Sequence, residues 1–239
     1  MSDDFDQDDT ESSITVVIEY TQDVSITRFM GSSLVPCRLS ITADVMPFEG
    51  VEEVDFDVAF AKIKFWFETI ISRCVICSRL NATGLSMILK EDGSPKLTNH
   101  LMFTPYEPTD EHLAVLFQSK MTALSAGMFQ FGCVKVKSDS SGLVFTYIGD
   151  WEKDLPTMDT WFSKKPYYFE TPWWTRDDVS TLDMIIGDDV DTLPPWAFKL
   201  DFIENSIRPN KSAVEKPPDE EVVIKFKPKV FDGGKEEDE

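Results

Sequence analysis

The chain contains few histidines and few basic residues. Only His100 and His112 occur among its 239 residues, and 23 lysines and arginines stand against 43 acids. Histidine is the usual general acid or base near neutral pH, and we expect neither of these two to be catalytic. The formal net charge of −20 disfavours contact with nucleic-acid phosphates and anionic lipids. We therefore expect no direct nucleic-acid binding and no membrane partner, and we favour protein partners with basic patches.

Long apolar runs and nucleotide-binding motifs are also absent. No run approaches the roughly 18 apolar residues of a membrane-spanning helix, and the acidic start MSDDFDQDDTE opposes a signal or transit peptide. The sequence has no glycine-rich phosphate loop, no dinucleotide fingerprint, no nucleophile elbow and no H-E-x-x-H pattern. We expect a cytoplasmic protein without a cofactor or bound metal. For a viral protein the location would be the host cytoplasm or the virion.

Cysteine is scarce, with Cys37, Cys74, Cys77 and Cys133 as its only occurrences. Cys74 and Cys77 form a C-x-x-C, a spacing used by zinc sites and redox pairs. A structural zinc would need a second ligand pair, and the sequence has none. A redox pair begins a helix, whereas we place this pair at the end of one. We predict that the four thiols are free and buried in the core.

The first half of the chain changes its hydrophobic period once. Residues 1–12 are acidic and predicted to be disordered. Apolar and polar residues alternate over 13–31 and again over 34–47, which predicts two antiparallel strands joined by a turn at Gly31. From Asp57, a predicted cap, apolar residues recur every three or four positions, which predicts a long amphipathic helix. Its apolar positions are Ala59, Ile63, Trp66, Phe67, Ile70, Cys74 and Cys77.

A second set of elements follows. The run GLSMILKEDGSPKLTNHLMFTP predicts two strands around the turn EDGSP. In EPTDEHLAVLF, Thr109 is the predicted N-cap of a second helix, with Asp110 and Glu111 in its first turn. Residues 129–150 predict a final hairpin. The order β-β-α-β-β-α-β-β predicts an α+β fold, an antiparallel sheet with two long helices on one face.

Composition shifts at Trp151. Residues 151–210 form an extension rich in tryptophan and proline, and residues 211–239 form an acidic, largely disordered tail with a possible strand in EVVIKFKPKVF. Aromatic side chains dominate protein interfaces, so we interpret those of the extension as candidate anchors for a partner. The alternative, which is compatible with the first, is that the extension wraps over its own chain. The candidate anchors are Trp151, Trp161, Tyr167, Tyr168, Trp173, Trp174 and Trp196.

Three strings in order resemble the tunnelling fold (T-fold), in its 6-pyruvoyl- and 6-carboxytetrahydropterin synthase branch. VDFDVAFAKI (54–63) resembles the start of the family's first helix, and EPTDEHLAVLF (107–117) is similar to the start of its second. CVKVKSDSSGLVFTYIG (133–149) resembles its last hairpin. The resemblance covers roughly residues 14–150, and it implies a T-fold domain over 13–150 that assembles with further copies of itself.

The same resemblance implies that the catalytic residues are missing. The family binds zinc with three histidines, and the positions of two of them align with Ser33 and Val35 in this chain. Neither serine nor valine can replace imidazole as a zinc ligand. The family's aspartate–histidine pair registers on Ser72 and Arg73. Its ligand-binding glutamate registers on Ser138, and its nucleophilic cysteine falls within SITRF, which has no cysteine.

We therefore expect no enzyme but a degenerate, pseudoenzyme-like T-fold protein, homo-oligomeric and serving as a structural or protein-interaction component. A bacteriophage is a candidate source, with the chain as a particle component or a host-acting factor. One alternative is a pterin- or purine-type ligand-binding protein or enzyme with an altered site between subunits. Another is an acidic inhibitor that mimics nucleic acid.

Overall fold

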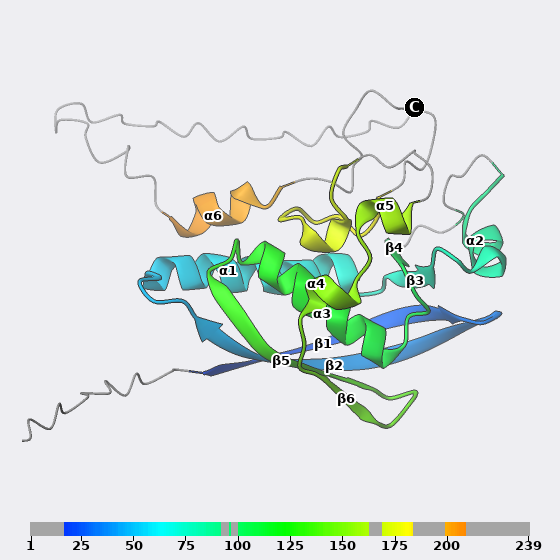
Figure 1. Cartoon of the computed structure of the whole chain (residues 1–239), viewed down its shortest axis with the longest axis horizontal. Helices are drawn as coiled ribbons and strands as arrows, with labels where there is room; N and C mark the ends of the chain where they lie inside the picture. The colour runs from blue at the N-terminus through cyan, green and yellow to red at the C-terminus, as the bar shows by residue number, and fades with distance from the viewer. Residues whose placement is uncertain (1–16, 92–95, 97–99, 163–168, 184–198, 209–239) are drawn as a thin grey trace, which may run out of the picture. The chain divides into compact units, whose positions relative to one another are not determined.

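The structure is a computed structural model that describes residues 17–91, 96, 100–162, 169–183 and 199–208 (Figure 1). The chain divides into two compact units, Met1–Arg208 and Pro209–Glu239. Every described residue belongs to the first unit. The predicted acidic tail at 1–12 and the possible strand in the acidic C-terminal tail lie outside the described residues, as does most of the predicted EDGSP turn.

The described unit is built on one sheet of six strands in the order β4-β3-β1-β2-β5-β6. The pairs β1–β2, β2–β5 and β5–β6 are antiparallel, whereas β1–β3 and β3–β4 are parallel. The α+β class is thus confirmed, and the prediction of an all-antiparallel sheet is wrong. The strands are β1 (Ile18–Met30), β2 (Ser33–Pro47), β3 (Val75–Ser78), β4 (Leu101–Thr104), β5 (Phe129–Ser138) and β6 (Val144–Tyr147).

The two long helices are α1 and α3, and Figure 1 shows both crossing the same face of the sheet, as the sequence predicted. The shorter helices follow the strands or belong to the extension. The helices are α1 (Glu53–Phe65), continued by the π-helical segment η1 (Trp66–Ile71), α2 (Ala82–Ile88), α3 (Asp110–Leu124), α4 (Trp151–Asp154), α5 (Met158–Trp161), the 3-10 turn η2 (Trp173–Thr175) and α6 (Asp201–Ile207).

The first helix begins and ends earlier than predicted. Its N-cap is Glu52, which makes no side-chain capping bond, so the prediction of Asp57 as the cap is wrong. The helical segment ends at Ile71, and Arg73 then turns the chain with a positive φ of 66°. The C-x-x-C therefore lies at the start of β3 and not in the helix. A short apolar run such as CVIC fits a buried strand as well as a helix end, which explains the error.

All four residues of β3 are buried, and the thiols of Cys74 and Cys77 are free and fully enclosed in the core. Burial raises the pKa of both thiols, to about 11 for Cys77. Cys37 and Cys133 are also free and buried. Cys37, Cys74 and Cys77 thus pack in the core, as the sequence indicated, whereas Cys133 lies outside that cluster and its Sγ donates to the Asp44 carboxylate at 2.9 Å.

The predicted strand pair after residue 83 is replaced by α2 and β4. Asn81 caps α2 by accepting a hydrogen bond from the Gly84 backbone N–H at 2.8 Å. A Cβ added at Gly84 would lie 2.7 Å from both the Cys77 Sγ and the Phe29 ring, so glycine lets α2 pack closely there. Because α2 forms a crossover between β3 and β4, the chain runs in the same direction in both strands, and the two strands pair in parallel.

The core lies between the sheet and its helices. Alternate residues of β2, from Cys37 to Val45, are at least 95% enclosed, while their neighbours are exposed or half-buried. Under the helices, Phe67 packs edge-on against Phe117 with ring centroids 5.3 Å apart. One face of the sheet is therefore apolar and covered, and the alternating pattern read from the sequence is confirmed for β1 and β2.

Candidate functional site

The start of α3 has the capping geometry that the sequence predicted. Thr109 is the N-cap, and its hydroxyl accepts a hydrogen bond from the His112 backbone N–H at 3.3 Å. Asp110 and Glu111 occupy the first turn, where their negative charge interacts favourably with the helix dipole. The predicted helix start is confirmed.

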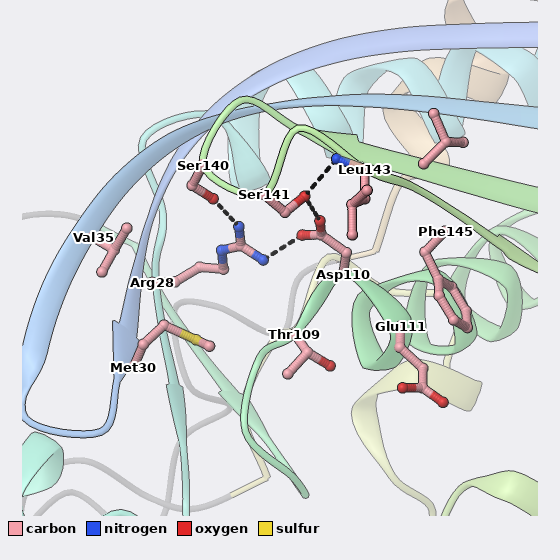
Figure 2. Close-up of a pocket in the computed structure, with 11 residues that line it drawn as sticks. Arg28, Met30, Val35, Thr109, Asp110, Glu111, Ser140, Ser141, Leu143 and Phe145 are labelled. Carbon is pink, nitrogen blue, oxygen red and sulfur yellow. Dashed lines mark hydrogen bonds and ion pairs between the residues drawn. The ribbon is translucent and has the colours of Figure 1, made fainter.

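Asp110 does more than stabilise a helix dipole, because it also forms an ion pair with Arg28 of β1. The Arg28 Nη1 lies 2.5 Å from the Asp110 Oδ1, and both side chains are largely buried. The same guanidinium donates to the Pro108 carbonyl at 3.2 Å and to the Ser140 hydroxyl at 2.7 Å. Figure 2 shows this pair between the β1–β2 hairpin and the turn between β5 and β6. Arg28 thus ties three separate parts of the chain together.

Two serines complete the contacts of the Asp110 carboxylate. The hydroxyls of Ser138 and Ser141 each donate to Oδ2 at 2.7 Å. Burial alone would raise the pKa of Asp110, but these hydroxyls and the charge of Arg28 together lower it below its ordinary value. The carboxylate is therefore charged at neutral pH.

A cavity of about 480 Å³ opens beside this pair. Its size falls within the range of small-ligand pockets, about 300–1,000 Å³. The β1–β2 hairpin, the start of α3 and the β5–β6 turn supply its walls, and most of its side chains are apolar or uncharged (Figure 2). Of its charged residues, Arg28 and Asp110 pair with each other, while Glu111 is exposed and has no ion pair within the described part of the chain. The lining residues are Arg28, Met30, Val35, Thr109, Asp110, Glu111, Ser140, Ser141, Leu143, Val144 and Phe145.

Two of the positions that the T-fold resemblance aligns with functional residues, Val35 and Ser138, lie at or near this cavity. Val35 lines it, and Ser138 donates to Asp110 at its edge. Arg73 instead lines another cavity of about 440 Å³, together with Cys37 and Asp139. Sequence reasoning found Asp110 and Glu111 as helix-start residues only. It missed Arg28, because nothing in the strand pattern of β1 indicates a buried guanidinium.

The two histidines lie in different surroundings. The His112 Nδ1 lies 2.8 Å from the Glu107 carbonyl oxygen and 3.2 Å from the Thr109 hydroxyl, and its ring packs 5.0 Å from that of Tyr106. His100 is exposed, and its carbonyl accepts from the Val75 N–H. No group of three or more histidines, cysteines or acids that could hold a metal ion occurs among the described residues.

The two edges of the sheet differ. The β4 edge is covered by the extension, since the Phe103 N–H donates to the Thr181 carbonyl at 3.1 Å and the Thr181 hydroxyl donates to the Leu101 carbonyl at 2.5 Å. At the opposite edge β6 pairs with β5 alone, and no described segment pairs with its outer side. Apolar side chains are exposed along that edge: Leu143 at 73%, Val144 at 57% and Ile148 at 76%.

Three of the candidate aromatic anchors lie in the chain's own core. Trp161, Trp173 and Trp174 are at most 6% exposed, so a partner cannot reach them in this arrangement. The extension therefore wraps over its own chain here, and these three are structural residues. Trp151 is half-buried and packs against the same core. Tyr167, Tyr168 and Trp196 lie outside the described residues.

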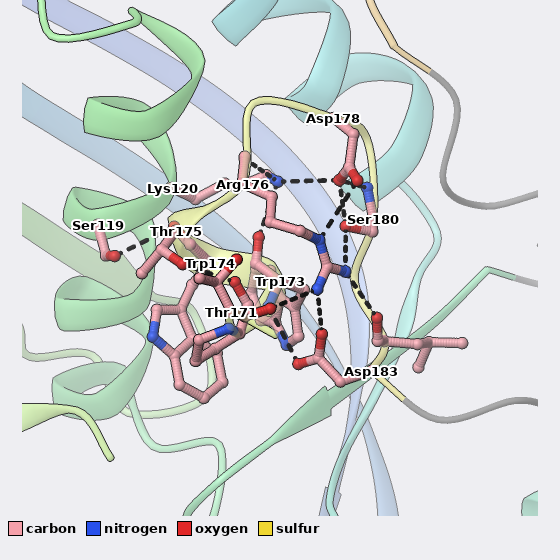
Figure 3. Close-up of polar contacts among 12 residues, drawn as sticks. Ser119, Lys120, Thr171, Trp173, Trp174, Thr175, Arg176, Asp178, Ser180 and Asp183 are labelled. Atoms are coloured by element: carbon pink, nitrogen blue, oxygen red, sulfur yellow. Dashed lines mark hydrogen bonds and ion pairs between the residues drawn. The ribbon is translucent and has the colours of Figure 1, made fainter. Parts of the chain in front are cut away.

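A buried lysine holds the extension to α3 (Figure 3). Lys120 is fully enclosed, and its Nζ donates to the carbonyls of Trp173 at 2.9 Å and Arg176 at 2.7 Å. The Asp178 carboxylate lies 3.7 Å away. Burial lowers the pKa of Lys120 to about 7, against the opposing attraction of Asp178.

Arg176 continues this buried network. It pairs with Asp183 and Asp178, and its Nη2 donates to the Ser180 hydroxyl at 2.7 Å. Asp183 also accepts the Trp173 N–H at 3.0 Å. Burial raises the pKa of Asp183 to about 6 despite its contacts with Arg176. Because these groups are enclosed and bonded to one another, the network stabilises the loop of residues 171–183.

No protein-family model and no curated protein matches this chain. Within the described residues, no helix has the length and apolar content needed to cross a membrane.

Proposed function

We propose that this chain is a non-catalytic, T-fold-like protein that serves as a structural or protein-interaction component. The observation that carries the proposal is the open edge of the sheet at β6. Its outer side carries no strand among the described residues, and Leu143, Val144 and Ile148 expose apolar surface beside it. Such an edge is a template for a strand from another chain, and proteins that do not use an edge usually block it with charge or proline.

The contrast with the β4 edge supports this proposal. There, the extension supplies hydrogen bonds through Thr181 and encloses the strand. Among the described residues, the extension covers the β4 edge, whereas no segment pairs with the outer side of β6 and the apolar side chains beside it are exposed. We interpret the open edge as the surface through which a second polypeptide adds a strand. Homo-oligomerisation, implied by the T-fold resemblance, stays a prediction that the same experiment measures.

The test replaces Ile148 by lysine. Lysine on an exposed edge opposes strand addition without removing a core residue, because Ile148 is 76% exposed. Light scattering gives the molar mass of the purified protein, and capture from the native source gives its bound partners. We expect Ile148→Lys to lose the assembly or partner that the unchanged chain retains.

Leu80→Lys is the matched control, because Leu80 is 75% exposed in the loop between β3 and α2, away from β6. It should leave assembly unchanged. The role of this edge would be refuted if the unchanged chain were monomeric and captured no partner. It would also be refuted if both variants lost assembly or partner binding equally.

The cavity at the start of α3 favours a second candidate, a ligand-binding protein of pterin or purine type. Its volume of about 480 Å³ and its mixed lining suit a small planar molecule. A thermal-shift panel of pterins and purines tests this alternative. A ligand at a hundredfold its dissociation constant should add about 2.7 kcal/mol of stability.

A further inference from the structure

We infer that the β6 edge and the adjoining cavity form one binding groove for an extended peptide segment of another protein, in which apolar residues alternate with basic ones. This inference rests on the proposed interaction function and specifies the chemistry of the partner. It is carried by three features that lie together: a strand edge that no described segment pairs with, an apolar hollow beside it, and the Glu111 carboxylate at the rim, which has no ion pair among the described residues.

The strand edge gives the binding mode. An added strand would lie beside Val144–Tyr147 and pair with the outward-facing backbone groups of β6. Among the described residues, β6 pairs only with β5, on its other side. Main-chain hydrogen bonds of this kind supply affinity without dependence on sequence. Alternate side chains of the added strand would then face the helix side of the sheet, where Phe145 and Tyr147 lie.

The cavity gives a site for an apolar side chain. Leu143, Val144 and Phe145 belong to the hairpin that carries β6, and all three line the cavity. Met30 and Val35 supply apolar surface from the β1–β2 hairpin. A side chain projecting from a strand beside β6 on the helix side would meet this surface, and burying a Val-, Leu- or Phe-sized group there favours binding.

Charge gives the second preference. Arg28 is buried and neutralised by Asp110, which leaves Glu111 as the exposed charge of the cavity lining. Figure 2 shows Glu111 beside Phe145, a β6 residue that also lines the cavity. A lysine or arginine in the partner segment would therefore be attracted to this rim.

The net charge also favours a different protein, rather than a second copy of this chain, as the occupant of the groove. The formal net charge of −20 makes the approach of two copies unfavourable at long range. A basic segment is instead attracted by the same field, which raises its association rate. A second copy at this edge is an outcome that the experiment can return.

The test measures the affinity of short synthetic peptides for the full chain by fluorescence anisotropy. In the first peptide, valine and phenylalanine alternate with lysine; in the second, glutamate replaces each lysine. In a third, proline at alternate positions removes the donors that strand pairing needs. We expect the first peptide to bind, and the second and third to bind at least about tenfold more weakly.

A charge exchange makes the test specific to the rim. Glu111→Lys should lower the affinity of the lysine peptide roughly fivefold, because an attraction becomes a repulsion. The same substitution should raise the affinity of the glutamate peptide, because a repulsion becomes an attraction. Glu53→Lys is the matched control, since Glu53 is also an exposed acid in the first turn of a long helix. It should change neither affinity beyond the effect of net charge.

The outcomes separate this inference from the proposed function. Equal binding of the three peptides, or equal effects of Glu111→Lys and Glu53→Lys, would overturn the peptide groove. If Ile148→Lys still abolished assembly, the open edge would keep its interaction role with a different occupant. If light scattering shows self-association of the chain that saturating lysine peptide reverses, a second copy is the occupant and the choice of a basic partner is overturned.

Discussion

Lys120 lies in an environment that differs greatly from that of an ordinary lysine. Its ammonium group is enclosed by the core and contacts two backbone carbonyls of the extension. Removing a charge from water is costly, and only good hydrogen bonds and a nearby carboxylate make such burial tolerable. Here the carboxylate is Asp178, at 3.7 Å. This single side chain therefore connects α3 to the loop of residues 171–183.

Replacing Lys120 by methionine tests that connection. Methionine keeps most of the volume but removes the Lys120 donor to the Arg176 carbonyl and one of the two donors to the Trp173 carbonyl, which also accepts the Arg176 N–H. We expect the free energy of unfolding to fall by about 3 kcal/mol, measured by urea denaturation. Lys153→Met removes a lysine that is 82% exposed and paired with Asp150. That control should unfold like the unchanged protein, and equal stability of Lys120→Met would contradict the structural role.

The same lysine predicts a pH dependence. An exposed lysine titrates near 10.5, whereas burial lowers the pKa of Lys120 to about 7. Between these values the unfolded chain binds a proton that the folded chain does not, so stability rises with pH in this window. Relative to Lys120→Met, the unchanged protein should gain up to about 1.4 kcal/mol per pH unit between about pH 7 and about pH 9. A flat or falling difference would contradict burial of the charge.

At the scale of elements, the start of α3 combines two roles in one stretch. Thr109 satisfies a backbone donor of the first turn, and Asp110 joins the helix to β1 through Arg28. The capping role could be predicted from local sequence, because a cap and the residues it serves are neighbours in the chain. The ion pair could not, because its partners are 82 residues apart and meet only when the sheet is assembled.

Thr109→Ala measures the contribution of the cap. Loss of the hydrogen bond to the His112 N–H should cost about 1 kcal/mol of stability in a denaturation experiment. Thr157→Ala is a close control, because Thr157 precedes α5 with nearly the same backbone angles but makes no capping bond. Equal losses in the two variants would show that the Thr109 hydroxyl is not the stabilising group.

The errors in the elements share one physical cause. The CVIC run and the GLSMI run are short and apolar, and such runs fit a buried strand, a helix end or a short helix equally well. Tertiary contacts decide between these states. Gly84 allows α2 to lie against Phe29 and Cys77, and this close packing favours a helix where the pattern suggested a strand.

At the scale of the whole molecule, the described extension is part of the domain and not an appendage. Trp173 and Trp174 are buried in the same core as Trp66, and Trp66 stacks on Trp173 with ring centroids 6.2 Å apart. The compact unit accordingly runs to Arg208. Its composition suggested a separate segment, because prolines and charges mark irregular backbone without showing what that backbone covers.

This arrangement predicts a single unfolding transition. Tryptophan fluorescence reports chiefly on the extension, and far-UV circular dichroism reports on the sheet and the long helices. If both belong to one cooperative unit, the two signals should change at the same urea concentration. Separate midpoints, with fluorescence changing first, would show that the extension detaches while the sheet stays folded.

The sequence by itself determined the α+β class, the first two strands, the capped second helix, the final hairpin and the burial of the thiols. Each of these follows from a local period or a capping residue, and local patterns are readable along the chain. Only the tertiary structure decided the parallel pairing of β3 and β4, the burial of Lys120, and the cavity that Arg28 and Asp110 border. These depend on contacts between residues far apart in the chain, which no local pattern records.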